Sequence, residues 1–359
     1  MFDGRYELWG NEHSFFTRKL QALLRYQGLD FDFRIKGQAE AKTIEARVGT
    51  HMIPALKTPA DWFIHDTTPI GLMLDAKYPE RAIVPRTPVQ RTACLLLEDW
   101  LDEWLGLHVL HTRWCYPENM DALGAAFAAN MLGQPGGAPL TEAQRENAGR
   151  MVLMLRDQFG LPACKRRGCG PERADFIRRD FDRLMGALQR HFARHPFLLG
   201  DRACLADFTL AGAFYAHFIS DPEPRRWVDE QAPELIDAME RIWNARCGEA
   251  WWPRDDALPE TLAPLVEQMT SGYHRCLTAT HQALADGEKW CVPEVDGTPL
   301  KMRALKYWEV SRGHVKSEIE RLSAAARKAV DEALGPTGAL TVYVAPSLFG
   351  TDSAMEARP

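Results

Sequence analysis

The sequence predicts an α/β domain over residues 1–80 followed by an extended all-α region. Short runs with strand-like alternation are interleaved with helical patterns in the first part, whereas helical periodicity dominates from residue 89 onward. Prolines at positions 79, 85 and 88 separate the two patterns and indicate a linker. With 359 residues, the chain is long enough to build two packed domains.

The elements of the first domain follow from hydrophobic periodicity and turn residues. Strand-like alternation occurs at residues 5–9, 31–35, 55–58 and 61–65. Helical patterns occur at residues 14–27, 36–48 and 68–77, and the middle one is polar and predicted to be short and irregular. Ser14 is the predicted N-cap of the first helix, and Gly28 is its predicted end. The resulting order, β-α-β-(α)-β-β-α, is similar to that of thioredoxin-like sheets.

Helical periodicity also organises the rest of the chain. Helices are predicted at residues 89–114, 174–195, 205–218, 233–246, 258–285 and 313–334, with a loop at 131–141 and a hairpin turn at 295–298. We therefore predict a first domain at residues 1–80, a linker at 81–88, a helical domain at 89–255 and a mostly helical C-terminal extension at 256–359.

Composition limits the classes of function. A net charge of -6 and a pI near 6.0 give no reason to expect a nucleic-acid partner. No window approaches the roughly eighteen uninterrupted apolar residues of a membrane-spanning helix, and the N-terminus lacks the pattern of a secretory signal. Eight scattered cysteines without such a signal favour reduced thiols. We therefore expect a cytoplasmic protein without a membrane partner.

The dipeptide Ile53-Pro54 is the most informative local feature of the sequence. It lies between the helix that Ser14 begins and a polar turn at Asp66-Thr67. A cis peptide bond before a short strand is retained only where tight local geometry demands it, and here it would turn the Ile53 main chain outward. A hydroxyl, this main-chain edge and an acidic turn at a helix start could together hold a small acidic peptide. That combination predicts a glutathione pocket.

Four segments of the sequence resemble the glutathione S-transferase superfamily. They are residues 14–19, Ile53-Pro54, residues 66–79 and residues 199–210. The resemblance covers roughly residues 5–250 and is to long bacterial members with an added C-terminal helical region. The chain departs from the family pattern at Cys204, where the family has a serine or threonine N-cap, and beyond about residue 255.

The resemblance implies a thioredoxin-like glutathione-binding domain, an all-α second domain and a homodimer. It implies that glutathione binds as a cosubstrate along the main chain of Ile53, next to Pro54. Asp66 and Thr67 would then receive its γ-glutamyl end, although an acidic residue and a hydroxyl before a helix are also common caps. The glycine carboxylate needs a cation, and four candidates remain open: Lys36, Lys42, Arg47 and His51.

One hydroxyl at the start of the first helix suffices to activate the thiol. Lowering a thiol pKa of about 8.5 by two takes about 2.7 kcal/mol. A hydrogen bond to a charged group contributes about 1.5–3 kcal/mol, and a helix N-terminus adds about 0.3–1 kcal/mol. The resemblance implies that Ser14 is this catalytic residue, with Asn11 and Thr17 as neighbouring substitutes; its simpler role is an N-cap. Because no cysteine precedes Cys94, thiol–disulfide chemistry is disfavoured.

The second substrate is expected to be a small aromatic electrophile. The resemblance implies that Trp100, Trp104 and His108 wall its pocket, although an aromatic stripe at this spacing is more often core or dimer interface. The acidic pairs at residues 98–99 and 102–103 are predicted to be a solvated face, and the basic run at 165–167 a loop surface. The pairs Cys164/Cys169 and His108/His111 lack further ligands, so no metal site is predicted.

The sequence-based hypothesis is therefore a glutathione S-transferase-type enzyme with a role in detoxification. Conjugation, ether cleavage and reductive dehalogenation all begin with the glutathione thiolate, and the sequence does not separate them. Two alternatives remain: a non-catalytic binding module with the same fold, and a glutathione-dependent isomerase or lyase.

Overall fold

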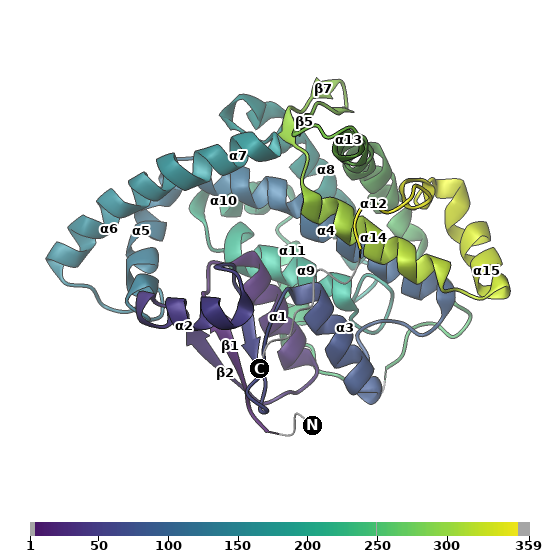
Figure 1. Cartoon of the computed structure of the whole chain (residues 1–359), viewed down its shortest axis with the longest axis horizontal. Helices are drawn as coiled ribbons and strands as arrows, with labels where there is room; N and C mark the ends of the chain where they lie inside the picture. The colour runs from purple at the N-terminus through teal and green to yellow at the C-terminus, as the bar shows by residue number, and fades with distance from the viewer. Residues whose placement is uncertain (1–3, 249, 351–359) are drawn as a thin grey trace.

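The N-terminal sheet is mixed and has the strand order β2-β1-β3-β4. The computed structural model describes residues 4–248 and 250–350. The strands are β1 Tyr6–Gly10, β2 Phe31–Ile35, β3 Ala55–Lys57 and β4 Phe63–His65. Strand β1 pairs in parallel with β2, whereas β3 pairs antiparallel with both β1 and β4. With α1 Phe15–Tyr26, α2 Gln38–Val48 and α3 Thr67–Lys77, these strands confirm the predicted element order (Figure 1).

Helix α2 is regular, not the short irregular helix that the polar sequence predicted. It ends at Gly49, whose φ of 76° only glycine adopts without strain. Ile44 and Val48 are the buried residues of this helix, and they pack in a small cluster with Ala55 and Phe63 of the sheet. A few apolar residues on one face are therefore enough to order a polar helix against the sheet.

Helices make up most of the remaining chain and lie above the sheet in Figure 1. Those before residue 250 are α4 Pro88–Trp114, α5 Glu118–Met131, α6 Glu142–Leu155, α7 Leu161–Arg167, α8 Ala174–Phe192, α9 Leu205–Ala213, α10 Pro222–Gln231 and α11 Leu235–Asn244. Those after it are α12 Ala263–Gln268, α13 His274–Ala285, α14 Lys306–Glu320 and α15 Ala324–Leu334. Periodicity predicted α4, α8, α9, α11 and the α12–α13 region, but not α5, α6, α7 or α10.

Two short antiparallel pairs join α13 to α14. Strand β5 Trp290–Cys291 pairs with β8 Met302–Arg303, and β6 Glu294–Val295 pairs with β7 Thr298–Pro299. The second pair confirms the predicted hairpin turn at 295–298.

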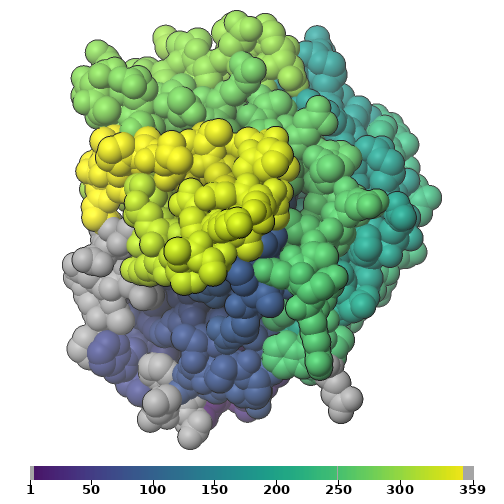
Figure 2. Space-filling view, turned by 90° about the vertical axis from the view of Figure 1, so that its right-hand side faces the viewer, coloured from purple at the N-terminus to yellow at the C-terminus, as the bar shows by residue number. Residues whose placement is uncertain are grey.

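The single helix predicted over residues 313–334 is two helices. Helix α14 ends at Glu320, and Ser323 begins α15 by accepting a hydrogen bond from the Ala326 N–H. This break allows both helices to pack against α4. Figure 2 shows the C-terminal part, in yellow, lying directly above the blue surface of the region that contains α3 and α4.

Helix α1 is held closely against α9. A Cβ on Gly212 would lie 2.8 Å from the backbone oxygen of Phe15 and 2.8 Å from the backbone nitrogen of Lys19, so only glycine permits this approach. In the first turn of α9, the Asp207 carboxylate accepts hydrogen bonds from the N–H groups of Cys204 (2.8 Å) and Leu198 (2.9 Å). The Asp207 carboxylate therefore stabilises the start of α9, where this chain has Cys204 as the N-cap in place of a serine or threonine.

Apart from the small cluster under α2, one hydrophobic cluster extends through the described residues from Tyr6 in β1 to Tyr343 near the C-terminus. The divisions at residues 80, 88 and 255 therefore stay predictions. Across the described parts of the chain, no helix has both the length and the apolar character needed to cross a membrane.

Candidate functional site

A cavity of about 400 Å³ lies where the sheet domain meets the helices, which is within the size range of small-molecule sites. We call it the cis-proline cavity, because the Ile53-Pro54 peptide bond in its wall is cis, as predicted. The lining residues of the sheet domain are Phe16, Thr50, Met52, Ile53, Pro54, His65, Asp66 and Thr67. Those of the helical region are Glu103, Arg167, Leu305, Tyr307 and Trp308.

Asp66 has an unusual backbone and does not serve as an ordinary helix cap. It precedes α3 with a φ of 73°, a conformation that costs a non-glycine residue about 1–3 kcal/mol and is concentrated at functional sites. Its carboxylate makes no capping hydrogen bond and instead accepts one of 2.8 Å from the Tyr307 hydroxyl. Burial raises the pKa of Asp66, and the Tyr307 hydrogen bond opposes that rise.

Thr67 is the first residue of α3 and is buried. The N-terminus of this helix therefore lies in the wall of the cis-proline cavity, where its free N–H groups favour an anion. The carboxylate of Asp66 next to it favours a cation. Together the two features suit the α-ammonium and α-carboxylate groups of an amino acid.

Ser14 is the N-cap of α1, and its Oγ accepts a hydrogen bond of 3.3 Å from the Thr17 N–H. It does not line the cavity itself, whereas Phe16, two residues further, does. A serine hydroxyl can accept through its oxygen and donate its proton at the same time, so capping is compatible with donation to a ligand. Of the two substitutes, Thr17 is fully buried against Gly10 and cannot reach a ligand. Asn11 accepts a hydrogen bond from the His13 N–H.

The loop before Ser14 is held by a buried ion pair. Arg113 donates to the His13 carbonyl (2.7 Å) and to the Asp221 carboxylate (2.7 Å). Burial alone would raise the pKa of Asp221, but Arg113 outweighs it and holds that pKa at about 2. Burial lowers the pKa of His13 to about 4, so this imidazole is neutral at physiological pH and supplies no positive charge.

The predicted electrophile residues on α4 do not reach the cavity. Trp100, Trp104 and His108 are fully buried, and none of them lines it. The Trp104 indole donates to Asp180 over 2.7 Å, and the His108 Nε2 lies 3.0 Å from the same carboxylate. The prediction that they wall an electrophile pocket is therefore wrong, because helix α8 and the later helices cover this side of α4.

The four carboxylates predicted as a solvated face of α4 are also buried. Lys19 of α1 reaches two of them, with its Nζ 2.5 Å from Glu98 and 2.6 Å from Asp102. Burial opposes the charge on Lys19, but the two carboxylates outweigh it and raise the lysine pKa. The other two, Asp99 and Glu103, are covered by hydroxyls of the C-terminal extension and by Arg167.

Arg167 is the lining arginine that sequence reasoning missed. The basic run at 165–167 was predicted as a loop surface, but it ends helix α7 and turns Arg167 inward. The guanidinium donates to Glu103 over 3.2 Å and lies 5.3 Å from the centre of the Trp308 ring. The only signal in the sequence was the basic run itself.

None of the four cations considered for the glycine carboxylate lines the cavity. Lys36 donates to Glu45 (2.8 Å) and to the His51 carbonyl (2.9 Å), beside the loop that contains Thr50. Arg47 pairs with Asp61 instead. In the described part of the chain, no group of three or more potential ligands is arranged to hold a metal ion.

Comparison with known proteins identifies the N-terminal domain. Residues 8–82 match the family model described as glutathione S-transferase, N-terminal domain. This range includes Ser14, Ile53, Pro54, Asp66 and Thr67. The search of curated proteins gave no significant match.

Solved glutathione S-transferases are similar at low identity. One from Methylobacterium radiotolerans, in complex with glutathione sulfonate, is 18% identical over 70% of this chain and 99% of that chain, with a TM-score of 0.39. One from Ceriporiopsis subvermispora, in complex with glutathione, is 14% identical over 67% and 99%, with a TM-score of 0.41. A β-etherase from Sphingobium sp. strain SYK-6 is 17% identical over 66% and 98%, with a TM-score of 0.40.

The likeness to this family lies in the N-terminal domain. Its matched residues, its β-α-β-α-β-β-α order and its cis Ile53-Pro54 bond agree with one another. Residues 8–82 therefore form a domain that is similar to the N-terminal domain of glutathione S-transferases.

Proposed function

We propose that this chain is an enzyme that binds glutathione in the cis-proline cavity and activates its thiol. The observation that carries this proposal is Asp66, which has a strained backbone and a carboxylate that does not cap its helix. A strained residue whose side chain faces a cavity is typical of a ligand contact. The adjacent N-terminus of α3 adds a place for a carboxylate.

In this proposal, glutathione lies along the main chain of Ile53 with its γ-glutamyl end at Asp66 and Thr67. The Ser14 hydroxyl donates a hydrogen bond to the sulfur while its oxygen continues to cap α1. The thiolate then attacks a small electrophile, and Leu305 and Trp308 of the C-terminal extension replace the buried α4 residues as its apolar wall. Both residues line the same cavity as Ile53, which supports this assignment.

Replacing Ser14 by alanine tests the proposal. Ser14→Ala removes a hydrogen bond to a charged group, worth about 1.5–3 kcal/mol, so turnover should fall about tenfold or more while glutathione still binds. Turnover is measured with 1-chloro-2,4-dinitrobenzene, and the thiolate by its ultraviolet absorbance in the glutathione complex. The variant should lose the thiolate band at neutral pH.

A matched control separates catalysis from helix capping. Ser323 is the N-cap of α15 and does not line the cavity. Its hydroxyl accepts a hydrogen bond of 3.3 Å, as the Ser14 hydroxyl does, and Ser323→Ala removes it. Each variant should lose about 0.5–2 kcal/mol of stability. Only Ser14→Ala should lose turnover; if both variants keep it, the catalytic role belongs to another residue.

The two alternatives differ in these same measurements. A non-catalytic binding module would bind glutathione without a thiolate band, and an isomerase or lyase would turn over without consuming glutathione. Conjugation, ether cleavage and dehalogenation remain equally compatible with an activated thiol. The homodimer, the cytoplasmic location and the role in detoxification stay predictions.

A further inference from the structure

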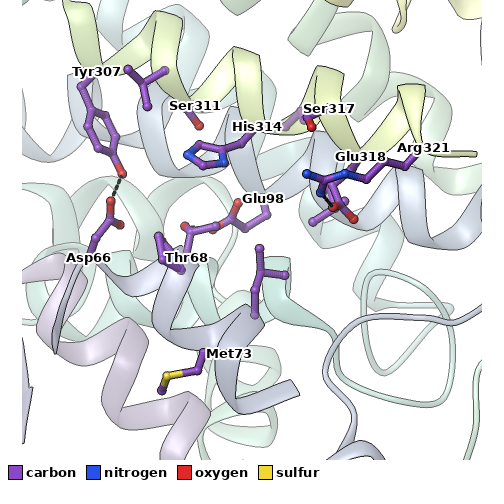
Figure 3. Close-up of a pocket in the computed structure, with 15 residues that line it drawn as sticks. Asp66, Thr68, Met73, Glu98, Tyr307, Ser311, His314, Ser317, Glu318 and Arg321 are labelled. Carbon is purple, nitrogen blue, oxygen red and sulfur yellow. Dashed lines mark hydrogen bonds and ion pairs between the residues drawn. The ribbon is translucent and has the colours of Figure 1, made fainter. Parts of the chain in front are cut away.

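A second cavity, of about 510 Å³, lies beyond Asp66 between α3, α4 and α14 (Figure 3). We call it the α14 cavity, because residues 307–321 form one side of it. Its lining residues are Asp66, Thr68, Pro69, Leu72, Met73, Leu95, Glu98, Tyr307, Val310, Ser311, His314, Val315, Ser317, Glu318 and Arg321. It shares only Asp66 and Tyr307 with the cis-proline cavity, so the hydrogen bond between these residues stands where the two cavities meet.

The α14 cavity has apolar walls and a few converging polar groups. Leu72 and Met73 of α3 contribute to one wall, and Val310 and Val315 of α14 contribute to another. Figure 3 shows Ser311 and other polar side chains of α14 directed across the space toward α3 and α4. A mostly apolar cavity with a few placed polar groups is typical of a small-molecule site.

In the described part of the chain, two of the three carboxylates that line this cavity form ion pairs, and Asp66 does not. Glu98 is paired with Lys19, and Glu318 is paired with arginines 91 and 321. Among the described residues, no ion pair is recorded for Asp66, whose hydrogen-bond partner is the uncharged Tyr307 hydroxyl. A half-buried carboxylate that no cation contacts directly favours a positively charged ligand.

We propose that the α14 cavity binds a small organic cation, a protonated amine on an apolar body. The ammonium group lies against Asp66, and the apolar body extends between Met73 and Val310.

The amine and glutathione would share Asp66, because the proposed function assigns the glutathione ammonium to the same carboxylate. Amine binding should therefore weaken glutathione binding, and glutathione binding should weaken amine binding by the same factor. This coupling rests on the proposed function, whereas the amine site itself does not.

Isothermal titration of the full chain with 2-phenylethylamine, without glutathione, tests the site. We expect saturable binding of one amine per chain with a Kd of about 1 mM or below. The neutral 2-phenylethanol, of nearly the same shape, should bind about tenfold or more weakly, since it lacks the charge that pairs with Asp66. Asp66→Asn should weaken the amine by a similar factor and leave the alcohol unchanged.

Filling the cavity provides a second test. Met73→Trp places a larger side chain in the space and should abolish amine binding. Met154→Trp, the same change at a half-exposed position on α6, should not alter it. Circular dichroism checks that both variants are folded. The comparison of the amine with the alcohol uses the unmodified chain and does not depend on either variant.

Three results would overturn the site: no saturable amine binding, equal binding of the alcohol, or unchanged binding in folded Met73→Trp. A glutathione titration of the same samples separates the two proposals. If the amine binds but glutathione does not, the proposed function fails and the amine site stands. If both bind without weakening each other, the sharing of Asp66 is wrong.

Discussion

Asp99 attaches the C-terminal extension to α4, and its protonation should control the stability of the chain. Its carboxylate accepts hydrogen bonds from the hydroxyls of Tyr273 (3.1 Å), Tyr343 (2.9 Å) and Ser311. These three hydroxyls come from separate segments of the extension, including α14, which carries Tyr307. Burial raises the pKa of Asp99 from 3.8 to about 7, although the hydroxyl donors oppose the rise.

The sign and size of the effect follow from this pKa. Because the folded-state pKa lies above the unfolded one, the folded chain binds the proton more tightly. The stabilisation is therefore complete below about pH 4 and is lost as the pH rises to about 7. A difference of about 3 in pKa, at about 1.36 kcal/mol for each unit of pH, corresponds to about 4 kcal/mol.

Asp99→Asn removes the ionisation and keeps the shape of the side chain, with one oxygen left to accept hydrogen bonds. Relative to the unmodified chain, its free energy of unfolding should rise by about 4 kcal/mol between pH 4 and pH 8. Urea unfolding at each pH, followed by tryptophan fluorescence, measures this difference and cancels the titration of other groups. Asp331→Asn, an exposed change on α15, is the control and should give a constant difference. A constant difference for Asp99→Asn would refute the reasoning.

Two further predictions concern Tyr307 and Lys19. Tyr307→Phe should raise the KM for glutathione about 2–10-fold with little change in kcat, because Asp66 loses the hydrogen bond that orients it. Tyr343→Phe, which also removes a tyrosine–aspartate bond but lies outside both cavities, should leave KM unchanged; equal effects would indicate a purely structural role. Lys19→Met should destabilise the chain by about 3–5 kcal/mol at pH 8 in urea unfolding, since it leaves Glu98 and Asp102 buried without their cation. A loss below about 1 kcal/mol would contradict the prediction that Lys19 stabilises these two carboxylates.

The sheet-domain wall of the cis-proline cavity and the helix start at Ser14 could be predicted because their signals are local. That helix start, the cis bond at Ile53-Pro54 and the turn at Asp66-Thr67 each depend on a few neighbouring residues. Turn and cap chemistry is read directly from such short segments. The same reasoning could not distinguish a helix cap from a ligand contact at Ser14 or at Asp66. For Asp66, the backbone conformation in the structure made this distinction.

Helix α4 shows where periodicity stops being informative. Almost every residue from Val89 to Trp114 is buried, so the helix has no solvated face for its charges. Trp104 and Glu98 therefore both lie in the interior, although one was predicted to contact a ligand and the other to face solvent. A helical pattern shows which side chains share a face, but not which segment will cover that face.

The sequence by itself determined the N-terminal domain, the order of its strands and helices, the helix start at Ser14 and the cis bond before Pro54. Only the tertiary structure decided that the C-terminal extension lies over α4 and that Tyr307 reaches Asp66 across 241 positions of the chain. The physical reason is that caps and turns are set by neighbouring residues. A cavity wall is set by long-range packing, in which buried surface and paired charges select the partner.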